Sequence, residues 1–178
     1  MAGGRRPWEV LVIDRWVVAM VSVRAHLWFH DNGYAAATFY EQAIPGTRIT
    51  NVTPAPEGVP GTPAGSPFVV ELDLAGVPFT FLSAGPSLTL DDAFSVLLSV
   101  DGQDEVDHYW EVLTADGGQP GPCGWLRDRF GVSWQVVPRR LGEIMSGPDG
   151  AGVARATAAM LQMSKLDVAA LEAAYAGS

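Results

Sequence analysis

The sequence predicts an α+β fold in which two βαβββ modules form an open barrel-like cleft, followed by a C-terminal helical tail. Strand-like and helix-like segments alternate and then begin again in the same order. A shift of 70 residues places Phe39-Tyr40-Glu41 on Tyr109-Trp110-Glu111, and a shift of 55 residues places Gly76-Val77 on Gly131-Val132. Each copy alone would leave one face of its sheet uncovered, so a duplicated module predicts two sheets that pair around a cleft.

The first predicted module covers residues 21–90. Its elements are a strand over residues 24–29, a helix over 34–43, a strand over 47–52, and two strands within 68–83 that meet at Ala75-Gly76. Apolar residues that alternate with polar ones between turn residues are typical of strands. Residues 53–67 are rich in proline and glycine, so they can form neither a helix nor a central strand and are predicted to be a loop.

The second predicted module covers residues 91–140, and the tail covers residues 141–178. The module's elements are a strand over residues 93–100, a helix over 104–115 after Asp101 as its cap, and strands in GPCGWLRDR and GVSWQVVP. The helix places Val106, Tyr109, Trp110 and Leu113 on one face. The alanine-rich tail, with Asp167 placed as an N-cap, predicts two or three further helices.

The composition argues against several classes of partner. The chain has 178 residues, of which 48% are hydrophobic and 17% charged, and this predicts a compact domain with a hydrophobic core. A net charge of −9, with basic residues that do not cluster, does not favour binding to nucleic acid or to an anionic membrane. The single Cys123 excludes an internal disulfide and fits a reducing compartment, so we expect a cytoplasmic protein.

Residues 1–20 are predicted to be an accessory extension of the domain. Two arginines precede an apolar stretch, as in a signal peptide, but charged residues interrupt that stretch. Its longest uninterrupted run is Trp16–Val23, which is shorter than the roughly 20 residues needed to span a bilayer. No small-residue cleavage site follows it. We therefore expect neither a signal peptide nor a membrane anchor here.

Three stretches of the chain carry a family resemblance. They are LWFHDNGYAAATFY, DEVDHYWEVLTADGGQPGPCGWLRDRFGVSWQVVPRRLGEI and AMLQMSKLDVAALEAAYAG. With them, residues 21–177 resemble the vicinal oxygen chelate superfamily, which includes glyoxalase I, extradiol dioxygenases and bleomycin-resistance proteins, and within it the PhnB-like branch. Members of this branch are often named 3-demethylubiquinone-9 3-methyltransferase-like. The chain has no strand–GxG–helix segment of the kind that a Rossmann-type methyltransferase uses for its nucleotide cofactor.

The resemblance implies four positions at which metal enzymes of the superfamily place their ligands. Counting five residues back from His30 and Val100, which precede the helix-entry residues Asp31 and Asp101, puts Ala25 and Ser95 at two of these positions. Counting four residues forward from the turn glycines Gly76 and Gly131 puts Thr80 and Gln135 at the other two. Alanine offers no donor atom, and the other three side chains are neutral, weak donors for a divalent transition metal. We therefore expect no metal and no cofactor, and we interpret Gln135 as the remnant of a lost metal site.

Strand alternation assigns the side chains that line the predicted cleft. The cleft residues predicted in this way are Phe29, Thr80, Ser95, Ser133 and Gln135. Trp125 lies on a strand of the second module and could equally belong to the core, the cleft or an interface. The opposite faces are nearly all apolar, as a face buried under helices requires, and His26 is their one polar member.

Two further groups of titratable residues have ordinary explanations. His26 and His30 would be roughly 13 Å apart on a strand, too far for shared coordination of a metal. Asp91 and Asp92 come directly before a strand, where acidic residues usually cap the backbone.

These observations leave two hypotheses for the function, with a third that has less support. The first is a metal-free, homodimeric protein that binds an unidentified small molecule. The second is an enzyme of the same superfamily, of the glyoxalase, dioxygenase or resistance-protein type, whose metal or catalytic group is not yet placed. The third is a purely structural dimerisation module. The tail carries an apolar stripe at near-helical spacing, made of Met160, Leu161, Met163, Leu166, Val168, Leu171 and Tyr175. We expect this stripe to cover a partner subunit in a homodimer; the alternative is that it folds back on its own chain.

Overall fold

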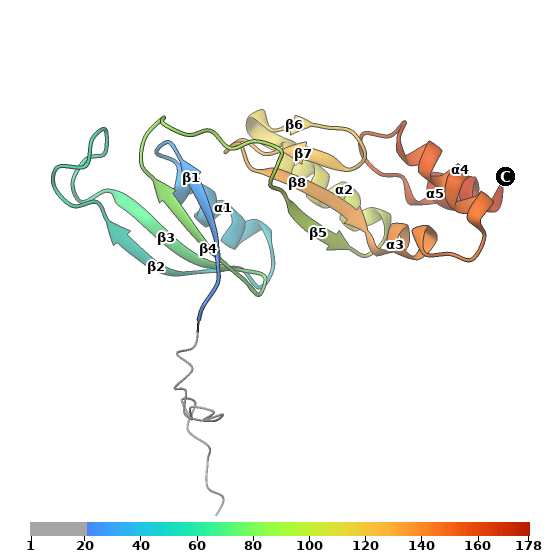
Figure 1. The fold of residues 1–178 in the computed structure, drawn as a ribbon, viewed down its shortest axis with the longest axis horizontal. Helices are drawn as coiled ribbons and strands as arrows, with labels where there is room; N and C mark the ends of the chain where they lie inside the picture. Colours follow the sequence, from blue (N-terminus) through green and yellow to red (C-terminus); the bar gives the residue numbers. More distant parts are fainter. Residues whose placement is uncertain (1–20) are drawn as a thin grey trace, which may run out of the picture.

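Two four-stranded sheets and five α-helices make up residues 21–178, which are the residues that the computed structural model describes (Figure 1). The strand order is β1-β4-β3-β2 in the first sheet and β5-β8-β7-β6 in the second. The two sheets lie end to end, and they do not close into a barrel within the described residues. The predicted fold class, an α+β fold of two modules with a helical tail, is confirmed. The predicted extension, residues 1–20, lies outside the described residues.

The first module has the predicted order of elements. They are β1 (Ala25–Phe29), α1 (Gly33–Ala43), β2 (Arg48–Pro54), β3 (Pro67–Leu74) and β4 (Val77–Ser83). Strand β1 runs parallel to β4, and the neighbouring strands are antiparallel. The turn between β3 and β4 requires a left-handed backbone at Gly76, with φ at 93°. Asp73 Oδ1 supports this turn because it accepts a hydrogen bond from Gly76 N at 2.6 Å.

The second module repeats this topology. Its elements are β5 (Val96–Val100), α2 (Gly102–Thr114), a short 3-10 turn (Ala115–Gly117), β6 (Gln119–Pro120), β7 (Trp125–Arg127) and β8 (Ser133–Pro138). Strand β6 has only two residues, and the sequence did not predict it. Asp101 precedes α2 as expected, but its side chain makes no capping hydrogen bond. Instead, Glu105, one turn further along the helix, accepts a hydrogen bond from Asp101 N at 2.7 Å and thereby satisfies a backbone donor at the helix start.

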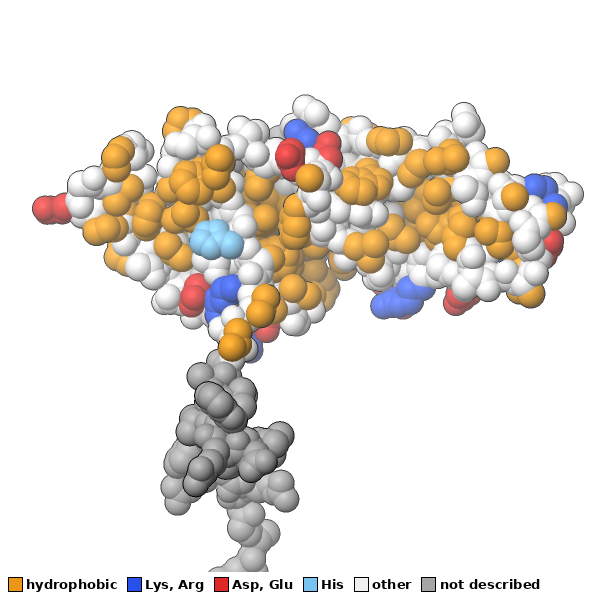
Figure 2. Space-filling model, in the orientation of Figure 1, with side chains coloured by type: hydrophobic (Ala, Val, Ile, Leu, Met, Phe, Trp, Pro, Cys, Tyr) orange, Lys and Arg blue, Asp and Glu red, His pale blue; other side chains and the backbone are white. Residues whose placement is uncertain are grey.

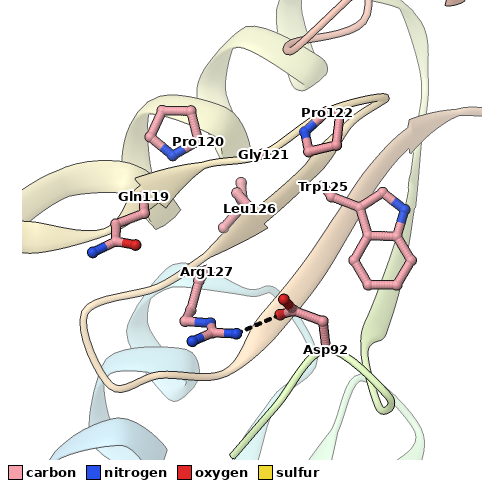
Figure 3. A pocket seen from close by; sticks show the side chains of 8 residues that line it. All are labelled: Asp92, Gln119, Pro120, Gly121, Pro122, Trp125, Leu126 and Arg127. Carbon is pink, nitrogen blue, oxygen red and sulfur yellow. Dashed lines mark hydrogen bonds and ion pairs between the residues drawn. The ribbon is translucent and has the colours of Figure 1, made fainter. Parts of the chain in front are cut away.

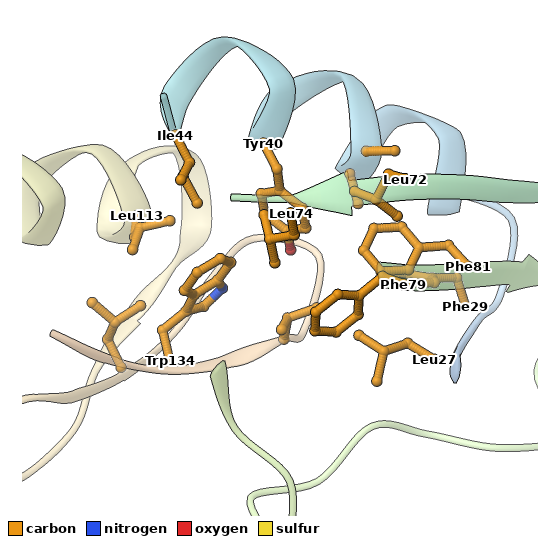
Figure 4. Close-up of a cluster of buried hydrophobic side chains, with 14 of the residues drawn as sticks. Leu27, Phe29, Tyr40, Ile44, Leu72, Leu74, Phe79, Phe81, Leu113 and Trp134 are labelled. Atoms are coloured by element: carbon orange, nitrogen blue, oxygen red, sulfur yellow. The ribbon is translucent and has the colours of Figure 1, made fainter. Parts of the chain in front are cut away.

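One hydrophobic core extends across both modules (Figure 4). Tyr40 of α1 lies at its centre and is fully buried. Its ring packs edge-on against Phe81 of β4, with centroids 5.9 Å apart, and against Trp134 of β8, with centroids 5.2 Å apart. Phe39 also reaches the second module, because its ring centroid lies 5.7 Å from that of Phe130. The two modules therefore share a single core.

The tail forms three helices with a small core of their own. They are α3 (Arg139–Met145), α4 (Gly150–Met160) and α5 (Val168–Ala176). Asp167 caps α5 as predicted, accepting a hydrogen bond from Ala170 N at 2.9 Å. The buried residues of this core are Leu141, Ile144, Ala156, Leu166 and Leu171, with Met160, Met163 and Tyr175 packed against them. Most of the apolar stripe of the tail thus packs on its own chain.

The tail is also attached to the second module through backbone groups. Cys123 N donates to Met163 O at 2.8 Å, and Gly124 N donates to Ser164 O at 2.7 Å. At Gly124 the backbone is left-handed, and a Cβ atom would lie 2.9 Å from Val136 O, so only glycine fits between tail and sheet. None of the helices over residues 21–178 is long and apolar enough to cross a membrane.

Candidate functional site

Each sheet has one face that its helix leaves uncovered. Helix α1 packs on β3 and β4, and helix α2 packs on β7 and β8. In Figure 1 both helices lie behind their sheets, so the open faces of the two sheets point in the same direction. Figure 2 shows hydrophobic side chains spread across this side of the molecule, with few charged groups among them.

The open face of the second sheet carries the residues that the sequence predicted for it. Gln135 of β8 pairs with Trp125 of β7 and with Leu97 of β5, and residues paired in this way point to the same face. Gln135 Nε2 donates to Ser95 Oγ at 2.8 Å. Ser133 lies two residues before Gln135 and therefore shares its face. The structure thus brings Ser95, Trp125, Ser133 and Gln135 together.

The first sheet differs from the prediction at β1. Strand β1 pairs in parallel with β4, which places Ala25 beside Phe79 and Phe29 beside Ser83. Phe29 packs on Phe81, with ring centroids 4.8 Å apart, and only 2% of its surface is exposed. Because α1 covers this face, Phe29 is a core residue. The prediction that Phe29 and Ala25 lie on the cleft side was wrong.

The open face of β1 carries His26 and Trp28 instead. His26 is exposed and pairs with Thr80 of β4, so the two side chains share a face. Thr80 is only 6% exposed, however, and it lines neither of the two hollows described next. Residues 84–95 form the connecting segment between the two modules. Trp28 Nε1 donates to Gly85 O at 2.8 Å and thereby fixes the start of this segment.

The first hollow, of about 490 Å³, lies on the second sheet (Figure 3). Its lining residues are Asp92, Gln119, Pro120, Gly121, Pro122, Trp125, Leu126 and Arg127. The volume lies within the range of roughly 300–1,000 Å³ that is typical of small-molecule sites. Of the three interpretations left open for Trp125, the structure places it at this hollow, where its side chain is half-buried.

Asp92 and Arg127 form the charged part of this hollow. Arg127 Nη2 donates to Asp92 Oδ1 at 2.7 Å, and the Ser133 hydroxyl donates to the same oxygen. The hydrogen bond from Arg127, followed by that from Ser133, lowers the pKa of Asp92 below its ordinary value. Asp92 was predicted to cap the backbone, whereas only Asp91 does so, accepting from Ala93 N at 3.0 Å. The one sequence signal for the pair was Arg127, which follows Trp125 on the same face of a strand.

The second hollow, of about 410 Å³, lies between β1 and the connecting segment. Its lining residues are His26, Leu27, Trp28, Leu88, Thr89, Leu90, Asp91, Phe94, Val132 and Ser133. The connecting segment contributes to both hollows, with Asp92 at the first one and Asp91 at the second. The two hollows are therefore neighbours on one side of the molecule.

A buried carboxylate lies behind this surface, on the helix-covered side. Asp128 Oδ2 accepts from the Tyr40 hydroxyl at 2.5 Å and from Trp134 Nε1 at 2.9 Å. Asp128 Oδ1 accepts from the backbone N–H groups of Phe130 at 2.9 Å and Val132 at 3.0 Å. Burial raises the pKa of Asp128, and burial beside this carboxylate also raises the pKa of Tyr40. No local pattern in the sequence indicated that Asp128 belongs to a buried network.

The side chains on the open faces do not fit a transition-metal site. His26 takes the place that was predicted for Ala25, because it is the residue of β1 that lies beside Thr80. Transition metals prefer thiolate, carboxylate and imidazole ligands. The open faces offer only one imidazole, together with the neutral hydroxyl and amide groups of Thr80, Ser95 and Gln135. Over residues 21–178, no three His, Cys, Asp or Glu side chains gather in a way that could hold a metal ion.

Comparisons with known proteins agree with this fold. The sequence model of the 3-demethylubiquinone-9 3-methyltransferase family matches residues 21–137. The PhnB protein of Bacillus cereus is 23% identical, with a TM-score of 0.58 over 66% of this chain and 99% of that chain. Protein PA1353 of Pseudomonas aeruginosa is 22% identical, with a TM-score of 0.55 over 66% of this chain and 97% of that chain. No curated protein matches the chain.

Proposed function

The chain belongs to the 3-demethylubiquinone-9 3-methyltransferase family and has the vicinal oxygen chelate fold, and on this premise we propose that it is a metal-free, homodimeric protein that binds a small molecule. The observation that carries the proposal is the hollow of about 490 Å³ on the second sheet, where Trp125 lies beside the Asp92–Arg127 pair. An aromatic wall with a few fixed polar groups is the usual make-up of a small-molecule site.

The chemistry of the open faces favours binding over catalysis. A general acid or base works best with a pKa near neutral pH. The pKa of Asp92 is instead lowered by its hydrogen bonds with Arg127 and Ser133, so Asp92 is held as a carboxylate. Gln135 and Ser95 have no titratable group, and they form a hydrogen bond with each other. The Asp92–Arg127 pair therefore suits the orientation of a molecule bound in the first hollow, whereas Gln135 and Ser95 line neither hollow.

The alternative is an enzyme of the same superfamily, and His26 is the observation that favours it. His26 is an exposed imidazole in the second hollow, with the Asp91 carboxylate among the lining residues. An imidazole is the most common proton-transfer group near neutral pH. If a compound is converted by the protein, His26→Gln is the variant that should abolish the conversion while leaving the melting temperature unchanged.

A thermal-shift screen tests the binding proposal. We expect compounds of a small-molecule library to raise the melting temperature of the wild-type chain, because a ligand that binds only the folded state stabilises it. Zn²⁺, Ni²⁺, Mn²⁺ and Fe²⁺ should not raise it. Trp125→Ala should remove the shift given by the compounds, whereas His26→Gln, at the second hollow, should retain it. A library with no stabilising compound, or one tightly held metal ion per chain, would contradict the proposal.

The homodimer is supported by exposed apolar side chains at the junction of the two modules. Leu97 on the open face of β5 is 56% exposed, and Phe94 and Val77 near it are also exposed. Strand β5 is an edge strand of its sheet, and exposed apolar edges favour pairing with another chain. Sedimentation at micromolar concentration should give twice the chain mass of 18.9 kDa. Leu97→Glu should shift this to the monomer mass, and Leu161→Glu on the tail should not. A wild-type monomer would disprove the dimer.

A further inference from the structure

The first hollow offers a ligand no net charge. Asp92 and Arg127 are the only charged side chains among its eight lining residues, and they are paired at 2.7 Å. An anionic ligand on Arg127 would be repelled by Asp92, and a cationic ligand on Asp92 would be repelled by Arg127. The local charge therefore favours a neutral ligand over either kind of ion.

The pair still has hydrogen-bonding capacity that it does not use. Arg127 donates through Nη2 to Oδ1 of Asp92, and this oxygen also accepts from Ser133. Within the described part of the chain, Oδ2 of Asp92 accepts no hydrogen bond, and Nε and Nη1 of Arg127 donate none. The pair thus presents an acceptor and a set of donors side by side (Figure 3). Hydrogen bonds that involve an ionised partner are about twice as strong as neutral ones.

The remaining walls of the hollow suit a flat apolar body. Leu126 and its strand partner Pro120 lie on the face of Trp134, which the helices cover. The apolar side chains that remain for the hollow are Trp125 and Pro122 (Figure 3). These side chains are rigid and apolar, so they bury a planar molecule at little cost in side-chain entropy. A bicyclic ring system is of a size that fits about 490 Å³.

We infer that the ligand of this hollow is a neutral, flat, apolar molecule that carries an N–H donor and a carbonyl acceptor side by side, as in a lactam. The N–H group donates to Asp92 Oδ2, the carbonyl accepts from Arg127, and the ring lies against Trp125. The inference rests on the proposed small-molecule function and adds the chemical class of the ligand.

Four bicyclic probes of similar size test the ligand class on the wild-type protein. They are quinolin-2(1H)-one, its N-methyl derivative, the 1-methylquinolinium cation and quinoline-2-carboxylate. Isothermal titration calorimetry should show that the lactam binds at least 10-fold more tightly than each of the other three. The N-methyl derivative keeps the ring and the carbonyl but lacks the donor, so it isolates the hydrogen bond to Asp92. This comparison needs no variant and therefore does not depend on the folding of one.

A variant cycle then assigns the hydrogen bond to its residue. In Asp92→Ala the lactam should lose at least 10-fold in affinity, and methylation of its nitrogen should then change the affinity less than 2-fold. Asp104→Ala, which removes an exposed carboxylate from α2, is the matched control and should bind all four probes as the wild type does. Equal loss for lactam and N-methyl lactam in Asp92→Ala would overturn the assignment.

The failure of this inference can be told apart from that of the proposed function. If library compounds stabilise the protein through Trp125 while quinoline-2-carboxylate or the quinolinium cation binds more tightly than the lactam, the neutral-lactam class is wrong and the binding function stands. If the lactam binds no more tightly than its N-methyl derivative, the class is wrong as well. If no compound of the library or the probe set binds, the inference and the proposed function are both wrong.

Discussion

Asp128→Ala is expected to lower the free energy of unfolding by about 3–5 kcal/mol. The carboxylate accepts four hydrogen bonds, from Tyr40, Trp134 and two backbone N–H groups. Each buried donor that loses its partner costs about 1–3 kcal/mol. Urea unfolding followed by tryptophan fluorescence measures the change. Asp104→Ala, on the exposed side of α2, should change the stability by less than about 0.5 kcal/mol. A loss below about 1 kcal/mol in Asp128→Ala would contradict the structural role.

Asp128→Asn tests the same carboxylate through pH. Burial raises the pKa of Asp128 in the folded state, so its stabilising contribution is fully present below the unfolded pKa of about 4 and is lost as the pH rises through the folded pKa. Asparagine keeps the shape of the side chain but does not titrate. The unfolding free energy of the wild type, measured relative to Asp128→Asn, should therefore fall as the pH rises above about 4. A relative rise over this range would show that the folded pKa is lowered.

Trp134→Ala is the second large expected effect, a loss of about 3–5 kcal/mol. The indole is fully buried, contacts Tyr40 of the other module and donates to Asp128 Oδ2. Its removal leaves a cavity in the core that the two modules share. Calorimetric unfolding should remain a single transition at a lower melting temperature.

Trp134→Phe separates packing from the hydrogen bond. Phenylalanine keeps an aromatic ring beside Tyr40 but has no N–H group for Asp128. The expected loss is about 1–2 kcal/mol, of the order of one hydrogen bond to a charged group with a small change in volume. A Phe variant as unstable as the Ala variant would mean that the ring packing matters little.

The repeat was sufficient to predict the fold. Matching Phe39-Tyr40-Glu41 with Tyr109-Trp110-Glu111 identified α1 and α2, and the turn glycines at 76 and 131 both have a left-handed backbone, with φ at 93° and 88°. The arrangement of the two sheets did not follow from the repeat. Contacts between the modules depend on side chains that differ between the two copies, such as Tyr40, whose counterpart is Trp110. The features that the two copies have in common therefore do not predict these contacts.

The error at β1 has a specific cause. Three residues separate β1 from α1, whereas Asp101 alone separates β5 from α2. The count treated Asp31 as the equivalent of Asp101, but Asn32 is the residue that directly precedes α1, as Asp101 directly precedes α2. The prediction for β1 was therefore off by one residue, and a shift of one residue exchanges the two faces of a strand. Burial alone could not correct the count, because β1 reads AHLWF and offers large apolar side chains on both faces.

The charged residues of the site could not be predicted for a different reason. Asp92 and Arg127 are 35 residues apart, and Tyr40 and Asp128 are 88 residues apart. Local sequence patterns indicate helices, strands and caps, but they carry no information on which distant side chains meet. Ser95 and Gln135 were predicted to share a face because strand alternation is a local property.

The hydrogen bond between Tyr40 and Asp128 joins two modules that the ribosome makes one after the other. The first module leaves the ribosome before its partner residues exist, since domains emerge from the N-terminal end. Until residues 128–134 follow, Tyr40 lacks both its acceptor Asp128 and the ring of Trp134, and Phe39 lacks the ring of Phe130. Partly made chains with uncovered apolar surface are prone to aggregate. Chains stalled between residues 90 and 128 are therefore expected to bind chaperones, and release should follow once the strand with Trp134 is complete.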